Sequence, residues 1–308
     1  MVRRLVAVLI VIVVIAAVAG WLLTAPRGLA ASDLPDHTPD LANGEYMFWA
    51  GGCESCHAPP DASADDLFNL AGGLDMVTPF GTFYAPNISP DEENGIGSWS
   101  TLDFVNAMKF GVGKGGEHLY PAFPYTSYQR MTLEDIIDLK AFLDTLEPVN
   151  NVVPAHDLGF PFNIRRGLGL WQLLYVDGET FVPDPDESDE INRGAYLVGG
   201  PAHCGECHSP RNAIGGIIAD RAYSGGPAPE GDGTVPNITP DPSGIGSWSA
   251  ADIVTMFQTG FTPEFDSVGG TMAAVQRNMA RLSDEDLAAM AAYLKSLPPI
   301  PSEDAPAS

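Results

Sequence analysis

The most apolar part of the chain is its N-terminal segment. Residues 5–23 form an uninterrupted run of 19 apolar or small residues, and Arg3 and Arg4 stand directly before it. At about 1.5 Å per residue, a helix of this length nearly spans a hydrocarbon core of roughly 30 Å. We predict that residues 1–31 form a single transmembrane anchor with its basic end in the cytoplasm. A cleaved signal peptide is the alternative, because small residues follow at 29–31. Both interpretations export the rest of the chain.

Beyond this segment the pattern changes to short stretches of helical periodicity separated by loops. Ser or Thr precedes several of these stretches, as in N-capped helices. The expected N-cap residues are Ser100, Thr132, Ser249 and Ser283. The last helix of each half is expected to stop before Pro148 or Pro298. Since no convincing alternation of apolar and polar residues is present, we predict an all-α fold with long Gly- and Pro-containing loops.

Three motifs occur twice, in the same order and about 150 residues apart. The pairs are Cys53-Glu54-Ser55-Cys56-His57 with Cys204-Gly205-Glu206-Cys207-His208, Pro86-Asn87-Ile88 with Pro236-Asn237-Ile238, and Gly95-Ile96-Gly97-Ser98-Trp99 with Gly244-Ile245-Gly246-Ser247-Trp248. The chain therefore contains two copies of one domain, predicted at 38–149 and 188–300. Residues 150–187 connect them. Asn87 and Asn237 fit either a cofactor pocket or a shared turn.

The four cysteines all belong to two Cys-x-x-Cys-His strings. This string is the signature of covalently attached haem c, in which two thiols add to the haem vinyl groups and the histidine binds the iron. A zinc site would need cysteine pairs at closer spacing, and local disulfides would not explain the histidines. We therefore predict two covalently bound haems. Cys53 and Cys56 would attach the first, and Cys204 and Cys207 the second.

These motifs together resemble the membrane-anchored cytochrome c subunits of bacterial quinoprotein alcohol, gluconate and related dehydrogenases. Further resembling stretches are Leu119–Tyr125, Ala141–Pro148 and Ala292–Pro299. The resemblance covers nearly all of residues 40–300 and implies two tandem class I cytochrome c domains after the N-terminal transmembrane helix. It also implies a bacterial inner-membrane location with the haem domains in the periplasm. Two departures are that those subunits usually carry three haems, and that they commonly have Met where Phe123 stands.

The resemblance implies that His57 and His208 are the proximal iron ligands and that each sixth ligand comes from the loop before the last helix. Met272 occupies that place in the second domain, where Gly269 and Gly270 allow close approach to a haem. The alternatives are Met256, which lies in the middle of a predicted helix and is assigned to the core, and Met279, which is nearer the last helix.

The sixth ligand of the first haem has several candidates. Met131 directly precedes the last helix of that domain and is the first choice. His118 could supply a second imidazole, and an open or water-bound site is a third choice. Met108 lies on a predicted helix and is assigned to the core.

Charge limits the partners of the chain. It carries a net charge of −25, from 40 Asp and Glu against 15 Lys and Arg, and every acid lies after residue 31. Such a chain is unsuited to nucleic acid. It should prefer positively charged redox partners, such as a dehydrogenase, a quinol-oxidising complex or a terminal oxidase.

The sequence therefore predicts a diheme cytochrome that transfers single electrons between periplasmic or membrane partners. An electron-accepting subunit of a membrane-bound dehydrogenase complex is the alternative. A haem enzyme that uses an open first haem is a third hypothesis, since no other catalytic motif is present.

The connector contains an apolar stretch at residues 160–175 that includes Arg165 and Arg166. We expect it to pack between the two domains. The alternative is a docking element for the membrane or for a partner.

Overall fold

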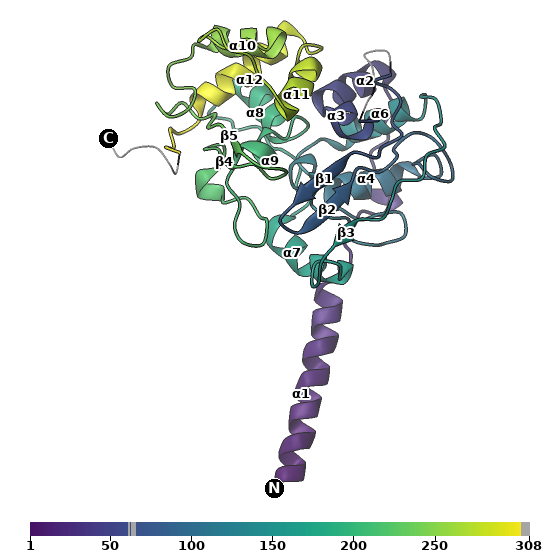
Figure 1. The fold of residues 1–308 in the computed structure, drawn as a ribbon. Helices are drawn as coiled ribbons and strands as arrows, with labels where there is room; N and C mark the ends of the chain where they lie inside the picture. Colours follow the sequence, from purple (N-terminus) through teal and green to yellow (C-terminus); the bar gives the residue numbers. More distant parts are fainter. Residues whose placement is uncertain (61, 63–65, 303–308) are drawn as a thin grey trace.

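The computed structural model describes residues 1–60, 62 and 66–302. It has a globular head on a long helical stalk (Figure 1). The stalk is α1 (Val2–Leu23), a helix of 22 residues of which none is buried. Within the described residues, α1 is the one helix that is long and apolar enough to cross a membrane. The predicted N-terminal apolar helix is therefore confirmed.

The head consists of two mostly helical halves. The first half contains α2 (Leu41–Ala50), α3 (Cys53–His57), α4 (Thr101–Phe110), α5 (Tyr125–Tyr128) and α6 (Leu133–Leu143). The second contains α8 (Asp189–Gly199), α9 (Cys204–His208), α10 (Ala250–Thr259), α11 (Thr271–Met279) and α12 (Asp284–Ser296). Short 3-10 helices lie at Ala31–Asp33, Arg165–Gly167 and Ala219–Arg221. The mostly helical fold agrees with the prediction.

Short strands add to this helical frame. β1 (Asp75–Thr78) and β2 (Gly81–Tyr84) form an antiparallel hairpin, and β3 (Asp157–Leu158) from the connector pairs with β2. β4 (Gly226–Pro227) pairs with β5 (Thr234–Val235). Segments of two to four residues are too short to show a period-two pattern, which is why the sequence did not predict them.

A glycine lets the first and last helices of each half cross closely. A Cβ at Gly44 on α2 would lie 2.1 Å from the Asp138 carbonyl oxygen on α6. A Cβ at Gly194 on α8 would lie 2.0 Å from the Ala289 carbonyl oxygen on α12. These separations are far below van der Waals contact, so both crossings require glycine.

The four expected N-caps are all formed. Ser100 and Ser249 each complete a capping box with an Asp three residues later, and Thr132 and Ser283 each accept from a backbone N–H three residues later. Each cap satisfies one of the backbone donors that a helix start leaves unpaired. The repeated local sequence thus produces the same helix starts in both halves.

The repeated asparagines hold a turn in each half. Asn87 donates to the Val149 carbonyl oxygen at 2.6 Å, and Asn237 donates to the Ile300 carbonyl oxygen at 2.7 Å. Each side-chain oxygen also accepts from the backbone N–H two residues later. Of the two interpretations left by the sequence, the shared turn is the one that these contacts match.

The connector lies against both halves. On α7 (Leu168–Tyr175), Trp171 is buried and donates to the Ile214 carbonyl oxygen in the second half at 3.0 Å. Gln172 donates to the Phe110 carbonyl oxygen in the first half at 3.1 Å. This face of α7 therefore packs between the halves, as expected.

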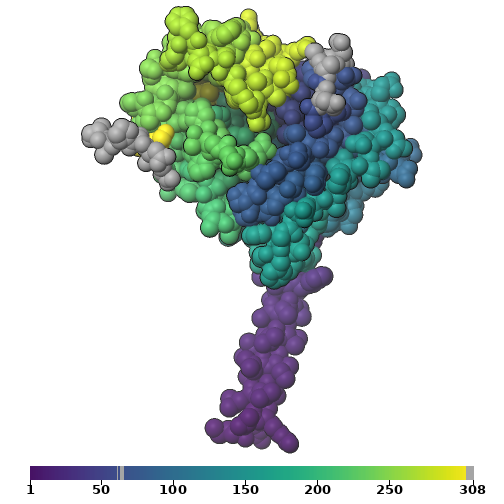
Figure 2. All heavy atoms as spheres, in the orientation of Figure 1, coloured from purple at the N-terminus to yellow at the C-terminus, as the bar shows by residue number. Residues whose placement is uncertain are grey.

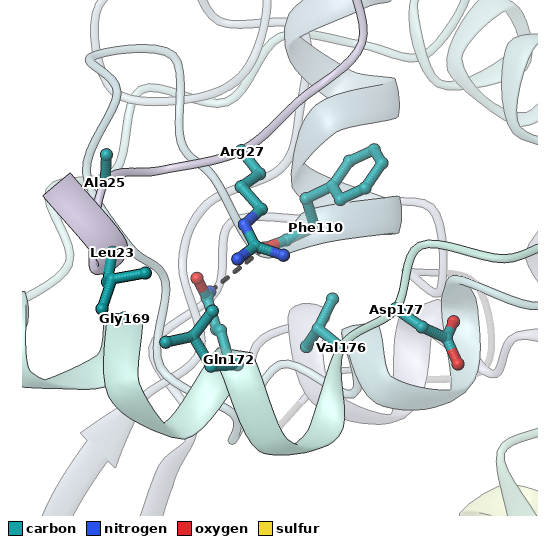
Figure 3. A pocket seen from close by; sticks show the side chains of 9 residues that line it. Leu23, Ala25, Arg27, Phe110, Gly169, Gln172, Val176 and Asp177 are labelled. Atoms are coloured by element: carbon teal, nitrogen blue, oxygen red, sulfur yellow. Dashed lines mark hydrogen bonds between the residues drawn. The ribbon is translucent and has the colours of Figure 1, made fainter.

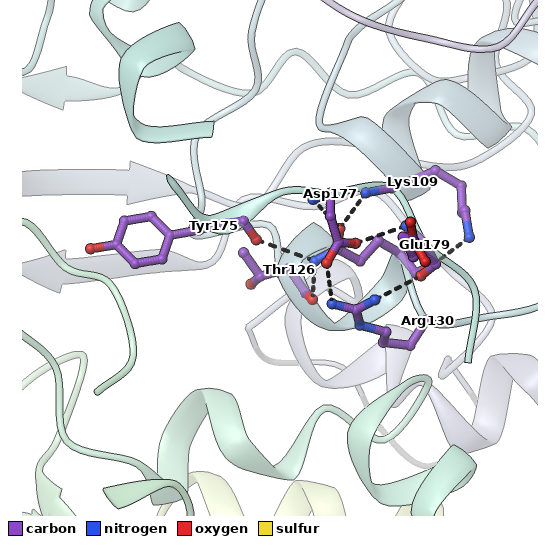
Figure 4. A network of polar contacts seen from close by, with 8 residues as sticks. Lys109, Thr126, Arg130, Tyr175, Asp177 and Glu179 are labelled. Atoms are coloured by element: carbon purple, nitrogen blue, oxygen red, sulfur yellow. Dashed lines mark hydrogen bonds and ion pairs between the residues drawn. The ribbon is translucent and has the colours of Figure 1, made fainter. Parts of the chain in front are cut away.

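A polar network fixes the segment that follows α7 (Figure 4). Arg130 pairs with Asp177 at 2.8 Å and donates to the Glu179 carbonyl oxygen. The buried Lys109 ammonium donates to Thr180 Oγ1 at 2.7 Å and to the Gln129 carbonyl oxygen. Burial lowers the Lys109 pKa to about 8.

Candidate functional site

The two Cys-x-x-Cys-His strings form the short helices α3 and α9. Cysteines three positions apart on a helix lie on the same face, one turn from each other. The residue before each first cysteine has left-handed backbone geometry, with φ 56° at Gly52 and 41° at His203. Each chain therefore enters its helix through the same sharp turn, although only one copy uses glycine for it.

All four cysteines are unpaired, and each is partly buried. Burial raises the pKa of the Cys53, Cys56 and Cys204 thiols to about 12 and also raises the pKa of Cys207. A structural zinc site needs four such side chains that converge on one point. No group of three or more metal-ligating side chains is present in the described residues. The chemistry fits thiol attachment to a cofactor better than a bare metal or a disulfide.

The two histidines are held in the same way. His57 Nδ1 lies 2.8 Å from the Pro86 carbonyl oxygen, and His208 Nδ1 lies 2.8 Å from the Pro236 carbonyl oxygen. A carbonyl only accepts, so in both rings Nδ1 carries the proton and Nε2 has the lone pair. Desolvation also lowers the pKa of both rings. A neutral ring that is oriented by a backbone carbonyl is the usual arrangement of a metal-binding histidine.

The two attachment helices come together at the contact between the halves. His203, directly before Cys204, lies with Nε2 3.2 Å from the carbonyl oxygen of Gly51, two residues before Cys53. The His203 ring also packs edge-on against Tyr128, with ring centroids 5.4 Å apart.

Buried glutamates on both attachment helices reach across the same contact. Glu54 on α3 accepts from Asn278 Nδ2 on α11 at 3.0 Å. Glu206 on α9 accepts from Ser127 on α5 at 2.9 Å and from Thr126. The sequence analysis did not single out these glutamates or His203. The sequence signal for them was an acidic residue at one of the two x positions of each Cys-x-x-Cys-His string, and a histidine directly before the second string.

The structure places the methionines in different surroundings. Met272 is the second residue of α11 and is partly buried, directly after the turn at Gly270. Met131 is 1% exposed and stands one residue before the N-cap Thr132. Its counterpart in the second half is Leu282, which is also buried and directly precedes Ser283. The assignment of Met131 as an iron ligand stays a prediction, and packing alone is a competing explanation of its burial.

The remaining candidates have other contacts. His118 has both ring nitrogens occupied, with Nδ1 2.6 Å from Gln172 Oε1 and Nε2 2.9 Å from the Thr24 carbonyl oxygen. It therefore joins the connector to the end of the stalk. Met108 and Met279 are buried on α4 and α11, and Met256 is partly buried on α10.

The sequence profile of the cytochrome c family matches residues 41–147 and 191–298. The chain belongs to the cytochrome c family. It contains two cytochrome c domains, each with one Cys-x-x-Cys-His site, and is a diheme cytochrome c.

Relatives extend this likeness over most of the chain. A diheme cytochrome c-type protein of Cereibacter sphaeroides is 48% identical over 97% of this chain and 99% of its own length. The fructose dehydrogenase cytochrome subunit of Gluconobacter japonicus is 39% identical over 85% of this chain and 53% of that subunit. The cytochrome c subunit of a quinone-dependent alcohol dehydrogenase from Gluconobacter oxydans is 36% identical over 92% of this chain and 61% of that subunit. The chain spans little more than half of these two dehydrogenase subunits.

The residues around α3 and α9 suit one haem in each cytochrome c domain. Paired thiols on one helix face can attach the porphyrin, and the adjacent imidazole offers a free Nε2 that a carbonyl keeps in the correct tautomer. The haem supplies one-electron redox chemistry when bound. The protein orients the imidazoles through Pro86 and Pro236, and it brings the two attachment helices into one interface.

Proposed function

We propose that this cytochrome is a membrane-anchored electron carrier that moves single electrons between periplasmic or inner-membrane partners through its two haems. The observation that carries this proposal is the contact between the attachment sites, where His203 meets the Gly51 carbonyl oxygen. Two redox centres at one interface favour rapid transfer within the chain. We assign Cys53 and Cys56 to one haem, Cys204 and Cys207 to the other, and His57 and His208 as the proximal ligands.

We further propose that α1 is kept as an anchor in the mature protein. Residues after the helix bind to the head, since Leu29 N–H donates to Asn106 Oδ1 at 2.7 Å and Asn106 donates back to the Leu29 carbonyl oxygen at 3.3 Å. His118 and Arg166 also contact Thr24. A segment that is removed on export has no need of such contacts. Mass spectrometry of the protein from native membranes tests this, because loss of residues 1–31 would contradict it.

We propose Met272 as the sixth ligand of the second haem, because it is the second residue of α11 and follows the positive-φ turn at Gly270. For the first haem we propose Met131 as the sixth ligand, on the basis of its position in the sequence directly before the last helix of that domain. The domain boundaries 38–149 and 188–300, with the connector at 150–187, are likewise proposed.

The function is tested by a redox titration of the full haem-loaded chain in membranes, followed by a stopped-flow experiment with a cationic electron donor. Two one-electron steps and rapid equilibration between the haems are the expected result. A single haem per chain, or slow exchange between two haems, would overturn the proposal.

The second candidate is an electron-accepting subunit of a membrane-bound dehydrogenase. The likeness to dehydrogenase cytochrome subunits favours it. The near full-length match to a diheme cytochrome c-type protein, whose name mentions no dehydrogenase, favours a separate carrier. Affinity purification of the tagged full chain from native membranes separates the two, since a subunit brings a flavin- or quinone-dependent dehydrogenase with it at fixed stoichiometry.

A further inference from the structure

The connector also has an exposed apolar side, on which Phe162 packs edge-on against Phe80 of the first half with ring centroids 4.9 Å apart. Its exposed apolar side chains are Phe160 (80% exposed), Phe162 (43%), Ile164 (52%), Leu170 (57%), Leu173 (37%) and Leu174 (68%). We call this set the connector patch. On α7, Trp171 and Gln172 are buried whereas Leu170 and Leu174 are exposed, so one side of the helix faces the head and its leucines face outward.

The connector segment that carries this patch, with α7, lies at the base of the head where the stalk joins it (Figures 1 and 2). Arg166 fixes this position, because its guanidinium lies 4.1 Å from the centre of the Trp21 ring and donates to Thr24 Oγ1 at 3.1 Å. A Cβ at Gly169 would lie 2.6 Å from the Thr24 carbonyl oxygen, so α7 meets the last turn of the stalk at close range. The head is therefore held at a set angle to α1.

Figure 3 shows this junction from close by. A small pocket of about 30 Å³ separates the end of α1 from α7, with Leu23, Arg27 and Leu173 among its lining residues. This volume leaves room for about one water molecule. The two elements therefore meet with little space between them.

The charge of the segment differs from that of the chain around it. Residues 158–176 contain two arginines and no acid, although Asp157 and Asp177 stand at the ends and the chain as a whole carries −25. Arginine beside exposed Phe and Leu is the composition of a segment that lies in a lipid interface, where the cations meet headgroup phosphates. A protein partner of this acidic cytochrome would be expected at an acidic face instead.

We propose that the connector patch dips into the bilayer that α1 spans, so that the head rests on the lipid surface through a second contact besides its anchor. Trp21 marks the level of the interface, and Arg166 over its ring puts the patch at the same level. The two contacts together fix the orientation of both haems relative to the membrane. This inference depends on the proposed retention of α1.

The test uses the full haem-loaded chain in nanodiscs of zwitterionic and anionic phospholipid. A nitroxide amino acid is introduced at one position at a time, at residue 174, at residue 12 in α1 and, as a control, at the exposed Phe265 far from the stalk. Collision with oxygen and with a water-soluble nickel chelate then reports the depth of each label. We expect residues 12 and 174 to lose most of their collisions with the chelate, and residue 265 to keep them.

A label at 174 that collides with the chelate as often as the label at 265, while residue 12 is protected, would overturn the connector contact and leave the anchor intact. An unprotected residue 12 would overturn both. In a second experiment the nitroxide is placed at residue 160. The double variant Leu170→Glu/Leu174→Glu should increase the collisions of this label with the chelate. The control Val182→Glu, at a residue of similar exposure, should leave them unchanged.

Discussion

Tyr46 on α2 donates a hydrogen bond to Asp286 at the start of α12, with 2.6 Å between the oxygens. The two residues belong to different domains, and the repeat supplies the same contact in the opposite direction. Tyr196 on α8, the counterpart of Tyr46, donates to Asp135 on α6, the counterpart of Asp286. The domains therefore face each other across a pseudo-twofold axis, and each uses one surface to bind its copy.

The first prediction concerns these tyrosines. Tyr46→Phe and Tyr196→Phe should each lower the free energy of unfolding by about 1.5–3 kcal/mol, since each removes a hydrogen bond to a partly buried carboxylate. Thermal unfolding of the haem-loaded protein checks this. Tyr84→Phe serves as the control, because no hydrogen bond from the Tyr84 hydroxyl is present in the described structure. Equal midpoints for all three variants would contradict the prediction.

The second prediction concerns the helix crossings. Gly44→Ala and Gly194→Ala should each destabilise the protein by about 1–3 kcal/mol, because the added Cβ overlaps a carbonyl oxygen and forces the helices apart. Gly159→Ala is the matched control, since nothing lies within 4 Å of its Cβ position. The thermal midpoint measured by circular dichroism gives the comparison.

The third prediction concerns acid. Burial acts to raise the pKa of Asp286, but hydrogen bonds from Arg193 and Tyr46 outweigh it and hold the pKa below its ordinary value. A carboxyl group with a lowered folded-state pKa contributes stability that is complete above its unfolded pKa, near 3.9, and is lost as pH falls through the folded pKa. We expect the urea midpoint to fall as pH drops below about 4. Asp286→Asn should reduce this dependence, and the exposed Asp232→Asn should not.

The fourth prediction concerns the sixth ligands. Met272→Leu should convert the second haem from low spin to high spin, as seen by electron paramagnetic resonance of the oxidised protein. If Met131 binds iron as the sequence predicts, Met131→Leu does the same to the first haem. An unchanged spectrum in Met131→Leu would show that Met131 does not bind iron and only packs in the core, as Leu282 does in the second domain.

The fifth prediction concerns docking. With a net charge of −25, the chain should bind cationic partners at rates that fall as ionic strength rises. Stopped-flow reduction by a basic donor protein at increasing salt provides the measurement. A rate that does not respond to salt would rule out electrostatic steering.

The sequence predicted the parts of this protein that depend on local chemistry. The apolar run predicted α1. Ser100 and Thr132 predicted the starts of two helices, and the repeated cysteine strings predicted the haem sites. Each of these signals lies within a short stretch of consecutive residues. The contacts between the domains were not predictable in this way. His203 and Gly51 are far apart in the chain, and only folding brings them together.

The connector shows the same limit. Its apolar composition predicted that residues 160–175 are not a loose loop, and Trp171 does pack between the domains. The sequence could not divide the stretch into two faces, since η2 (Arg165–Gly167) interrupts the helical periodicity just before α7. His118 was a candidate ligand for a similar reason. Its contact with Thr24, which is distant in the chain, cannot be predicted from the sequence.

The reciprocal tyrosine contacts have an evolutionary consequence. The arrangement is that of a symmetric homodimer whose two subunits have become one polypeptide. In a true homodimer every substitution occurs on both sides of the axis at once, and the two redox centres stay identical. Fusion removes this constraint, so one copy can acquire a buried lysine at position 109 while the other keeps an exposed glutamine at 258. The two haems can then differ in potential, and an electron has a preferred direction of travel.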